Sequence, residues 1–236
     1  MALPIIESPK YETKIPSTGK KIFYRPYLVR EEKVLMLALE SEDQSQIMQA
    51  MKDIVKACTF DKIEPDKLCV FDLEFLFLKL RSKSVGEISK VGLKCEKCTK
   101  PTDVEINLET VDVNMVNRAS NKIKLTDTIG VIMTWPKVNA VSKLEAKQSG
   151  IDNALDVIVS CIDAVYDDKK SYPSDEQSHE DMIKFLESLN QSQFAKIQAF
   201  VEDMPRLQHE VSFTCANKEC GHGNKLTITG LQSFFA

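Results

Sequence analysis

Four of the chain's seven cysteines form two close pairs, and this spacing constrains the fold more than any other feature of the sequence. Cys95 and Cys98 make the first pair, and Cys215 and Cys220 make the second. Two thiolates that are two to four residues apart can occupy one edge of a tetrahedral metal site, so two such pairs supply the four ligands of a structural zinc ion. Residues 99–214 separate the pairs, which predicts a site that joins distant chain segments across an inserted domain.

The four cysteines could instead be buried or unused thiols, but the sequence around each pair favours a metal site. Alternating apolar and polar residues, which are typical of strands, flank both pairs. We therefore predict a discontinuous zinc ribbon, formed by residues 91–110 and 209–230, with one structural zinc ion per chain. Because four thiolates leave no coordination position for water, a catalytic zinc is not expected. Whether His222 also contacts the metal stays open.

Length and charge exclude several classes of protein. A chain of 236 residues can bury a core without help from metals or disulfides. Its longest apolar runs fall short of the roughly 18 residues of a membrane span, so none is expected. The first seven residues lack the basic and apolar regions of an export signal, so we expect the cysteines to meet a reducing compartment. A formal net charge of -4 argues against a broad nucleic-acid interface.

Residues 1–29 contain four prolines and lack helical periodicity, which predicts an extended arm with a short strand at Lys21–Tyr24. The arm mixes basic and aromatic residues. It could be merely solvated, or it could bind nucleic acid, but docking onto a partner protein is the preferred use because prolines keep it extended and aromatic rings can fill pockets. The candidate partner-binding residues are Tyr11, Lys14, Lys20, Lys21, Phe23, Tyr24, Arg25 and Tyr27.

Apolar residues at helical spacing recur through much of the chain. They predict a helix pair at residues 30–39 and 44–58, with Asp43 as the cap of the second helix. The very apolar stretch 68–80 fits a helix or a strand, and its lack of glycine and proline favours a helix. Three further helices are expected: one at 151–165, one that follows a capping box at Ser174 and Gln177, and one that ends at Pro205. These further helices are placed from the apolar residues Ile151, Leu155, Ile158, Ile162, Val165, Met182, Leu186, Phe194 and Phe200.

Together these patterns predict an α+β fold with a mainly helical body, a discontinuous four-cysteine zinc ribbon and an extended N-terminal arm. The expected segments are an arm at 1–29, a first helical part at 30–90, the ribbon at 91–110 plus 209–230, a β-hairpin at 111–140, a second helical part at 141–205 and a tail at 231–236.

The residues do not indicate an enzyme. The string at 17–20, Ser-Thr-Gly-Lys, is similar to the end of a phosphate-binding loop, but the upstream glycine is absent and Pro16 precedes it. Cys58, Cys69 and Cys161 lie on apolar stripes, which is typical of small buried side chains rather than nucleophiles. No catalytic residues are therefore predicted.

Three stretches resemble the T4-type bacteriophage baseplate hub assembly proteins. They are the arm at 11–33, the apolar stretch at 71–84, and the second cysteine pair followed by Gly-Leu-Gln-Ser-Phe-Phe at 230–235. The resemblance implies a non-enzymatic phage tail protein that acts as a chaperone or scaffold for baseplate hub proteins. It also implies a location in the host cytoplasm during assembly or in the tail baseplate.

Two other functions stay open. The protein could be a structural component that remains in the mature baseplate. It could also be a zinc-ribbon regulator that binds nucleic acid, which the basic residues around the first cysteine pair would support and the acidic balance of the chain opposes. Those basic residues are Lys90, Lys94, Lys97 and Lys100.

Overall fold

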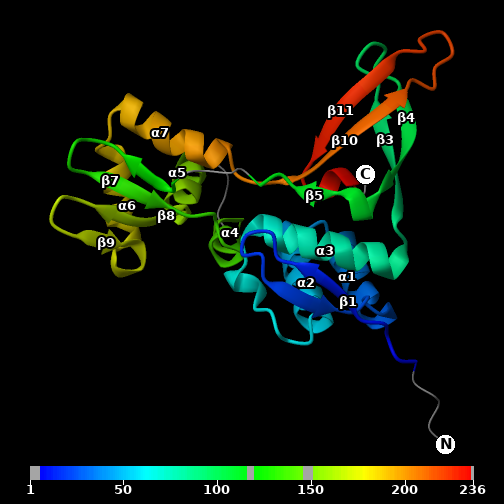
Figure 1. The fold of residues 1–236 in the computed structure, drawn as a ribbon, viewed down its shortest axis with the longest axis horizontal. Helices are drawn as coiled ribbons and strands as arrows, with labels where there is room; N and C mark the ends of the chain where they lie inside the picture. Colours follow the sequence, from blue (N-terminus) through cyan, green and yellow to red (C-terminus); the bar gives the residue numbers. More distant parts are fainter. Residues whose placement is uncertain (1–5, 116–119, 146–150, 235–236) are drawn as a thin grey trace, which may run out of the picture. The chain divides into compact units, whose positions relative to one another are not determined.

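The computed structural model describes residues 6–115, 120–145 and 151–234 (Figure 1). The chain divides into two compact units. Unit 1 comprises Met1–Pro65, Phe71–Met115 and Pro205–Ala236, and unit 2 comprises Asp66–Val70 and Val116–Met204. Unit 2 is therefore inserted in the sequence of unit 1. Within the described residues, none of the helices combines the length and the apolar character that a bilayer crossing requires.

Unit 1 combines helices with antiparallel hairpins. Its elements in chain order are β1 (Tyr11–Lys14), β2 (Lys21–Tyr24), α1 (Val29–Glu40), α2 (Gln44–Cys58), α3 (Val70–Val85), β3 (Ile88–Lys94), β4 (Pro101–Asn107), β5 (Asp112–Val113), β10 (Leu207–Thr214) and β11 (Gly223–Thr229). Strand β1 pairs with β2, β3 with β4, and β10 with both β11 and β5, all antiparallel. Short 3-10 turns lie at Pro65–Lys67, Leu108–Thr110 and Leu231–Phe234.

Helix α3 forms the centre of unit 1 because it is apolar on almost every side. The largest of its buried side chains are Phe71, Leu73, Phe75, Leu76, Phe77, Leu78 and Leu80. The polar groups that it buries have partners. The carboxylate of Asp72 accepts hydrogen bonds from the backbone N–H of Ser17 at 2.9 Å and from its hydroxyl at 2.5 Å, and Lys79 donates to the carbonyl of Glu109 at 2.8 Å. These bonds offset the cost of taking charge out of water.

Unit 2 is a four-stranded antiparallel sheet with helices. Its elements are β6 (Lys122–Lys124), β7 (Gly130–Met133), α4 (Val138–Glu145), α5 (Ile151–Ser160), β8 (Ile162–Tyr166), β9 (Ser171–Pro173), a 3-10 turn at Ser174–Glu176, α6 (His179–Glu187) and α7 (Gln191–Glu202). The strand order is β6-β7-β8-β9. Residues of β7, β8, α5, α6 and α7 share one apolar core, in which Trp135 stacks on Phe200 with ring centres 4.4 Å apart.

The predicted fold class, a mainly helical body with an extended arm and a zinc ribbon, is wrong. The described residues form four antiparallel sheets as well as seven α-helices, and the four cysteines lie at the ends of two separate hairpins. The arm is not extended, because residues 11–24 close into the β1–β2 hairpin. It packs onto the unit through buried Ile15, Ile22, Tyr24 and Tyr27. The prolines of this region lie outside the two strands, so they leave the pairing intact.

Two helical predictions in unit 2 are also wrong. Ile162 and Val165 belong to strand β8, although their spacing from α5 fits a helix. Pairing with β7 decides the outcome, because it completes the backbone hydrogen bonds of both strands. Helix α6 is capped by Ser178, which accepts a hydrogen bond from the N–H of Asp181, and Ser174 instead begins a 3-10 turn. By contrast, the predicted cap of α2 is confirmed, because Asp43 accepts from the N–H of Ser45.

Candidate metal centre

Two hairpins bring the four paired cysteines together. The first pair lies in the connection between β3 and β4, and the second lies in the connection between β10 and β11. These hairpins lie side by side in Figure 1. The sulfur atoms of four cysteines all lie within 4.8 Å of one another: Cys95, Cys98, Cys215 and Cys220. The four side chains thus lie close together, as the sequence predicted, and the cluster could hold a metal ion.

The two connections use the same kind of turn. In each one, the residue after the second cysteine has a left-handed backbone, with φ at 58° for Thr99 and 54° for Gly221. In the first, the N–H of Cys95 donates to the carbonyl of Lys100 at 3.0 Å, which closes the loop. In the second, the N–H of Cys215 donates to the carbonyl of His222 at 2.9 Å. Each turn thus directs both of its sulfurs to one side.

Hydrogen bonds also join one connection to the other. Asn224 is 3% exposed, and its side-chain oxygen accepts from the N–H of Glu96 at 2.9 Å. The N–H of Ala216 donates to the hydroxyl of Thr102 at 3.1 Å. Two neutral bonds of this kind contribute about 1 kcal/mol each. They align the two hairpins, but by themselves they stabilise the arrangement of the four sulfurs only weakly.

The electrostatics of the cluster favour a bound cation. Hydrogen bonds from the backbone N–H groups of Cys98 and Lys97 lower the pKa of the Cys95 thiol to about 6. For Cys215, a hydrogen bond from the Asn217 backbone acts to lower the pKa, but burial and the neighbouring sulfurs raise it to about 11. The four thiols therefore cannot all ionise in contact with one another unless a positive charge lies between them.

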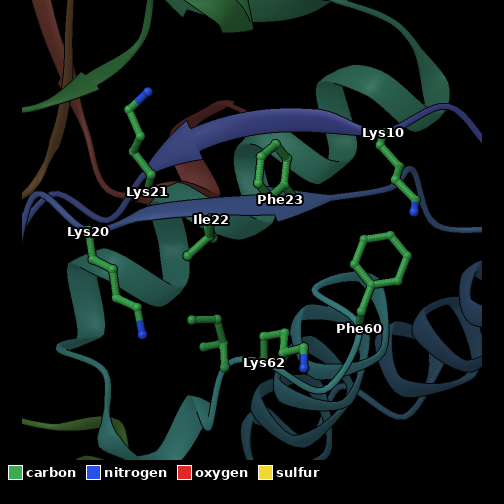
Figure 2. Close-up of a pocket in the computed structure, with 8 residues that line it drawn as sticks. Lys10, Lys20, Lys21, Ile22, Phe23, Phe60 and Lys62 are labelled. Carbon is green, nitrogen blue, oxygen red and sulfur yellow. The ribbon is translucent and has the colours of Figure 1, made fainter.

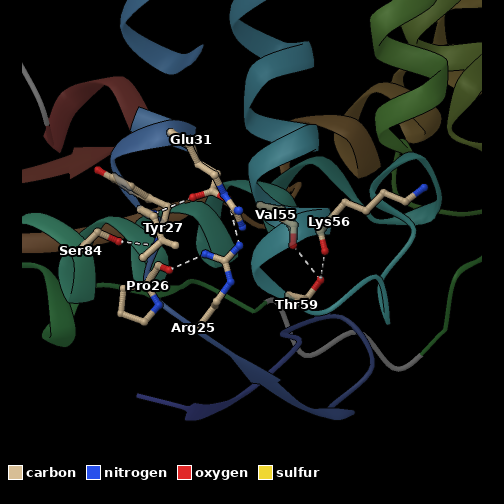
Figure 3. Close-up of polar contacts among 10 residues, drawn as sticks. Arg25, Pro26, Tyr27, Glu31, Val55, Lys56, Thr59 and Ser84 are labelled. Atoms are coloured by element: carbon tan, nitrogen blue, oxygen red, sulfur yellow. Dashed lines mark hydrogen bonds and ion pairs between the residues drawn. The ribbon is translucent and has the colours of Figure 1, made fainter. Parts of the chain in front are cut away.

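The other candidate residues lie on the β1–β2 hairpin and in the segment between β2 and α1, and only some of them are exposed. Tyr24 and Tyr27 are buried in the core of unit 1. Arg25 bridges the end of β2 and the start of α1, because it donates to the carbonyl of Pro26 and to the carboxylate of Glu31, each at 2.9 Å (Figure 3). These three side chains are thus occupied inside the unit. Tyr11 is half-buried, and the exposed members of the set are Lys14, Lys20, Lys21 and Phe23.

A basic groove lies beside this hairpin, and sequence reasoning missed half of it. Figure 2 shows the groove between strand β2 and the loop that follows α2. Its volume is about 770 Å³, and its lining consists of Lys10, Lys20, Lys21, Ile22, Phe23, Phe60, Lys62 and Ile63. The loop residues carry no motif, since an isolated aromatic and an isolated lysine after a helix are ordinary. Only the tertiary fold places them opposite the hairpin.

The comparisons with known proteins gave one match. A family model described as T4 bacteriophage base plate protein matches residues 8–236. Neither the curated proteins nor the solved structures contain a match. The match covers both units and both hairpins of the cysteine cluster.

Proposed function

This chain belongs to the T4 bacteriophage base plate protein family, and on that premise we propose that it acts in building the central hub of the phage baseplate, as a chaperone or scaffold that binds hub proteins. The family is one of structural phage proteins, so its members work by contact with other baseplate proteins. The match over nearly the whole chain supports the baseplate part of the proposal, and the sequence resemblance described above supports the hub and chaperone part. We propose accordingly that the protein is not an enzyme.

We also propose that the four cysteines bind one structural zinc ion. With Zn–S bonds of about 2.3 Å, a tetrahedron of sulfurs has edges of about 3.8 Å. The sulfurs of Cys98 and Cys215 are 3.5 Å apart and those of Cys95 and Cys220 are 4.0 Å apart, so two edges of the cluster are close to this length, and all of them are within 4.8 Å. A zinc ion would offset part of the negative charge of the four thiolates and connect the two hairpins. His222 serves this arrangement through its backbone carbonyl, and its ring is not needed as a ligand.

A pull-down tests the assembly function. Tagged protein is expressed in productively infected host cells, treated with nuclease and analysed by mass spectrometry of the proteins that remain bound. Recovery of baseplate hub proteins that survives nuclease supports the proposal and identifies the client. Recovery of nucleic acid without tail proteins would reject it. Mass spectrometry of purified virions then separates a chaperone, which leaves before maturation, from a component that stays in the baseplate.

The competing function is nucleic-acid binding near the first cysteine pair. Exposed Lys94, Lys97 and Lys100 favour it, whereas Lys90 is already paired with Glu105 at 3.4 Å. Raising the salt concentration distinguishes the two functions. Phosphate contacts release condensed counterions, so nucleic-acid binding would fall steeply from 50 to 200 mM salt, while docking onto a protein surface would be screened and fall far less.

A further inference from the structure

The basic groove beside β2 has one side made of an unpaired strand edge. Among the described residues, strand β2 pairs with β1 alone, and the N–H of Ile15 donates to the carbonyl of Lys20 at 3.0 Å where the hairpin closes. Antiparallel pairing alternates, so the backbone N–H and C=O groups of Lys21 and Phe23 face the opposite edge of β2. The next outward group, the N–H of Arg25, donates to the carbonyl of the last α2 residue at 3.0 Å, which confirms the direction.

Within the part of the chain that the structure describes, no hydrogen bond reaches the N–H or C=O of Lys21 or Phe23. An edge of this kind is a template for another extended chain. Its floor is apolar, since Ile22 and Ile63 are both buried at the groove. A strand laid along β2 would therefore find backbone partners on one side and an apolar surface beneath.

The side chains around the groove are positively charged. Lys10, Lys20 and Lys62 line it, and among the described residues none of the three takes part in an ion pair. Figure 2 shows Lys20 on the side of β2 that faces Lys62, whereas Lys21 extends to the other side, where its amino group lies 2.8 Å from the carboxylate of Glu12. Three lysines without a counter-charge would attract an occupant that carries carboxylates.

The backbone at Phe60 gives a further reason to treat the groove as a site. Phe60 has φ at 57°, and the residue is 38% exposed. It follows the end of α2, where glycine is the usual residue with a left-handed backbone. A bulky residue is strained there, and the ring remains partly exposed instead of being enclosed in the core. The ring instead faces the groove, 5.3 Å from the amino group of Lys10.

We propose that this groove binds an extended acidic segment of a partner protein, which adds a third strand to the hairpin along β2 and places an apolar side chain against Phe60. This inference rests on the proposed function and deepens it by naming the chemistry of the partner. Two copies of this chain paired along β2 would bring their groove lysines together, so a second copy is disfavoured. A nucleic-acid strand would satisfy the lysines but not the backbone groups of β2.

The test uses the full chain and a displayed library of random nonapeptides as the probe. Peptides are selected on the wild-type protein, and the affinity of the most enriched one is measured by fluorescence anisotropy. We expect acidic sequences that alternate with apolar residues. The double variant Lys20→Glu/Lys62→Glu should bind at least ten-fold more weakly. The control Lys33→Glu/Lys169→Glu changes the net charge equally at exposed positions outside the groove and should bind within two-fold of wild type. Circular dichroism checks that both variants fold.

Backbone methylation separates strand addition from simple charge attraction. N-methylation of every second residue of the peptide in the phase that faces β2 should weaken binding at least ten-fold, and the opposite phase should have little effect. Selection of peptides without acidic residues, equal loss in both double variants, equal effects of the two methylation phases, or preferential binding of an oligonucleotide at the groove would each overturn the inference.

The same variants separate this inference from the proposed function. If the groove variant still recovers hub proteins in the pull-down, the assembly function stands and the groove inference fails. If wild-type protein binds the acidic peptide but recovers no tail proteins, the groove inference stands and the assembly function fails.

Discussion

Replacing Glu31 by glutamine should destabilise unit 1 and change how its stability depends on pH. The Glu31 carboxylate accepts hydrogen bonds from Arg25 at 2.9 Å, Arg30 at 2.7 Å and the N–H of Leu28 at 2.7 Å. Burial opposes the charged form, but these bonds outweigh it and lower the pKa of Glu31 from 4.5 to about 2. The carboxylate therefore fixes both the end of β2 and the first turn of α1.

The size of the effect follows from the pKa shift. A shift of about 2.5 units at about 1.4 kcal/mol per unit corresponds to about 3 kcal/mol, which is an upper estimate for the ionised form. The side chains of Glu31 and Arg25 are only 10% and 11% exposed, so solvent screens the pair weakly. Because the folded-state pKa is lowered, this stability is fully present above pH 4.5 and is lost as the pH falls toward 2. The glutamine variant cannot show that loss.

The assay is urea unfolding at pH 7, 4.5, 3 and 2, followed by far-UV circular dichroism. Trp135 is the only tryptophan and lies in unit 2, so its fluorescence reports the unfolding of that unit. A transition seen by circular dichroism but not by fluorescence is then assigned to unit 1. The difference between wild type and variant should be about 3 kcal/mol at pH 7 and approach zero near pH 2. Glu12→Gln, which removes an exposed ion pair, should cost less than about 1 kcal/mol. A Glu31→Gln difference below about 1 kcal/mol, or one independent of pH, would refute the reasoning.

Three further predictions concern the cysteine cluster, the sheet of unit 2 and the groove. Cys98→Ser should lower the zinc content, measured by plasma mass spectrometry, from one ion per chain to well below one, and it should also lower the melting temperature. The control Cys69→Ser should leave the zinc content unchanged, and folded wild-type protein without zinc would contradict the prediction. Gly130→Ala should destabilise unit 2 by about 2 kcal/mol in urea unfolding followed by tryptophan fluorescence, because the added Cβ would overlap the Tyr166 hydroxyl, and an unchanged transition would count against it. Phe60→Gly should raise the free energy of unfolding by about 1 kcal/mol, because glycine adopts the left-handed backbone without strain. The same variant should bind the selected acidic peptide more weakly, and a loss of stability would show that the ring contributes to the core.

The sequence was most informative where the physical cause is local. The spacing of the cysteine pairs requires tight turns, and such turns are specified by a few neighbouring residues. The cap of α2 at Asp43 is equally local, since a side chain accepts from an N–H two residues ahead. Helix α7 ends at Glu202, shortly before Pro205, because proline cannot continue a helix.

The sequence failed where distant residues decide the structure. Ile162 satisfies helical and strand periodicity alike, and its partner in β7 lies about 30 residues earlier in the chain. The strand at Lys21–Tyr24 was predicted and is confirmed as β2, but its partner β1 was missed because a four-residue strand gives a weak signal. The packing of the hairpin depends on the contact of Ile22 with the distant core. The groove needs Lys20 and Lys62 on facing walls, which no local pattern records.

The insertion of unit 2 imposes an order of events during protein synthesis. Cys98 is translated 122 positions before Cys220, so at about 5–20 residues per second the first half of the cluster waits about 6–24 s for its last sulfur. Strands β10 and β11, which belong to unit 1, also leave the ribosome after unit 2. Unit 2 can fold while the ribosome still holds them, so the segment encoded in the middle of the gene matures before the segments that surround it.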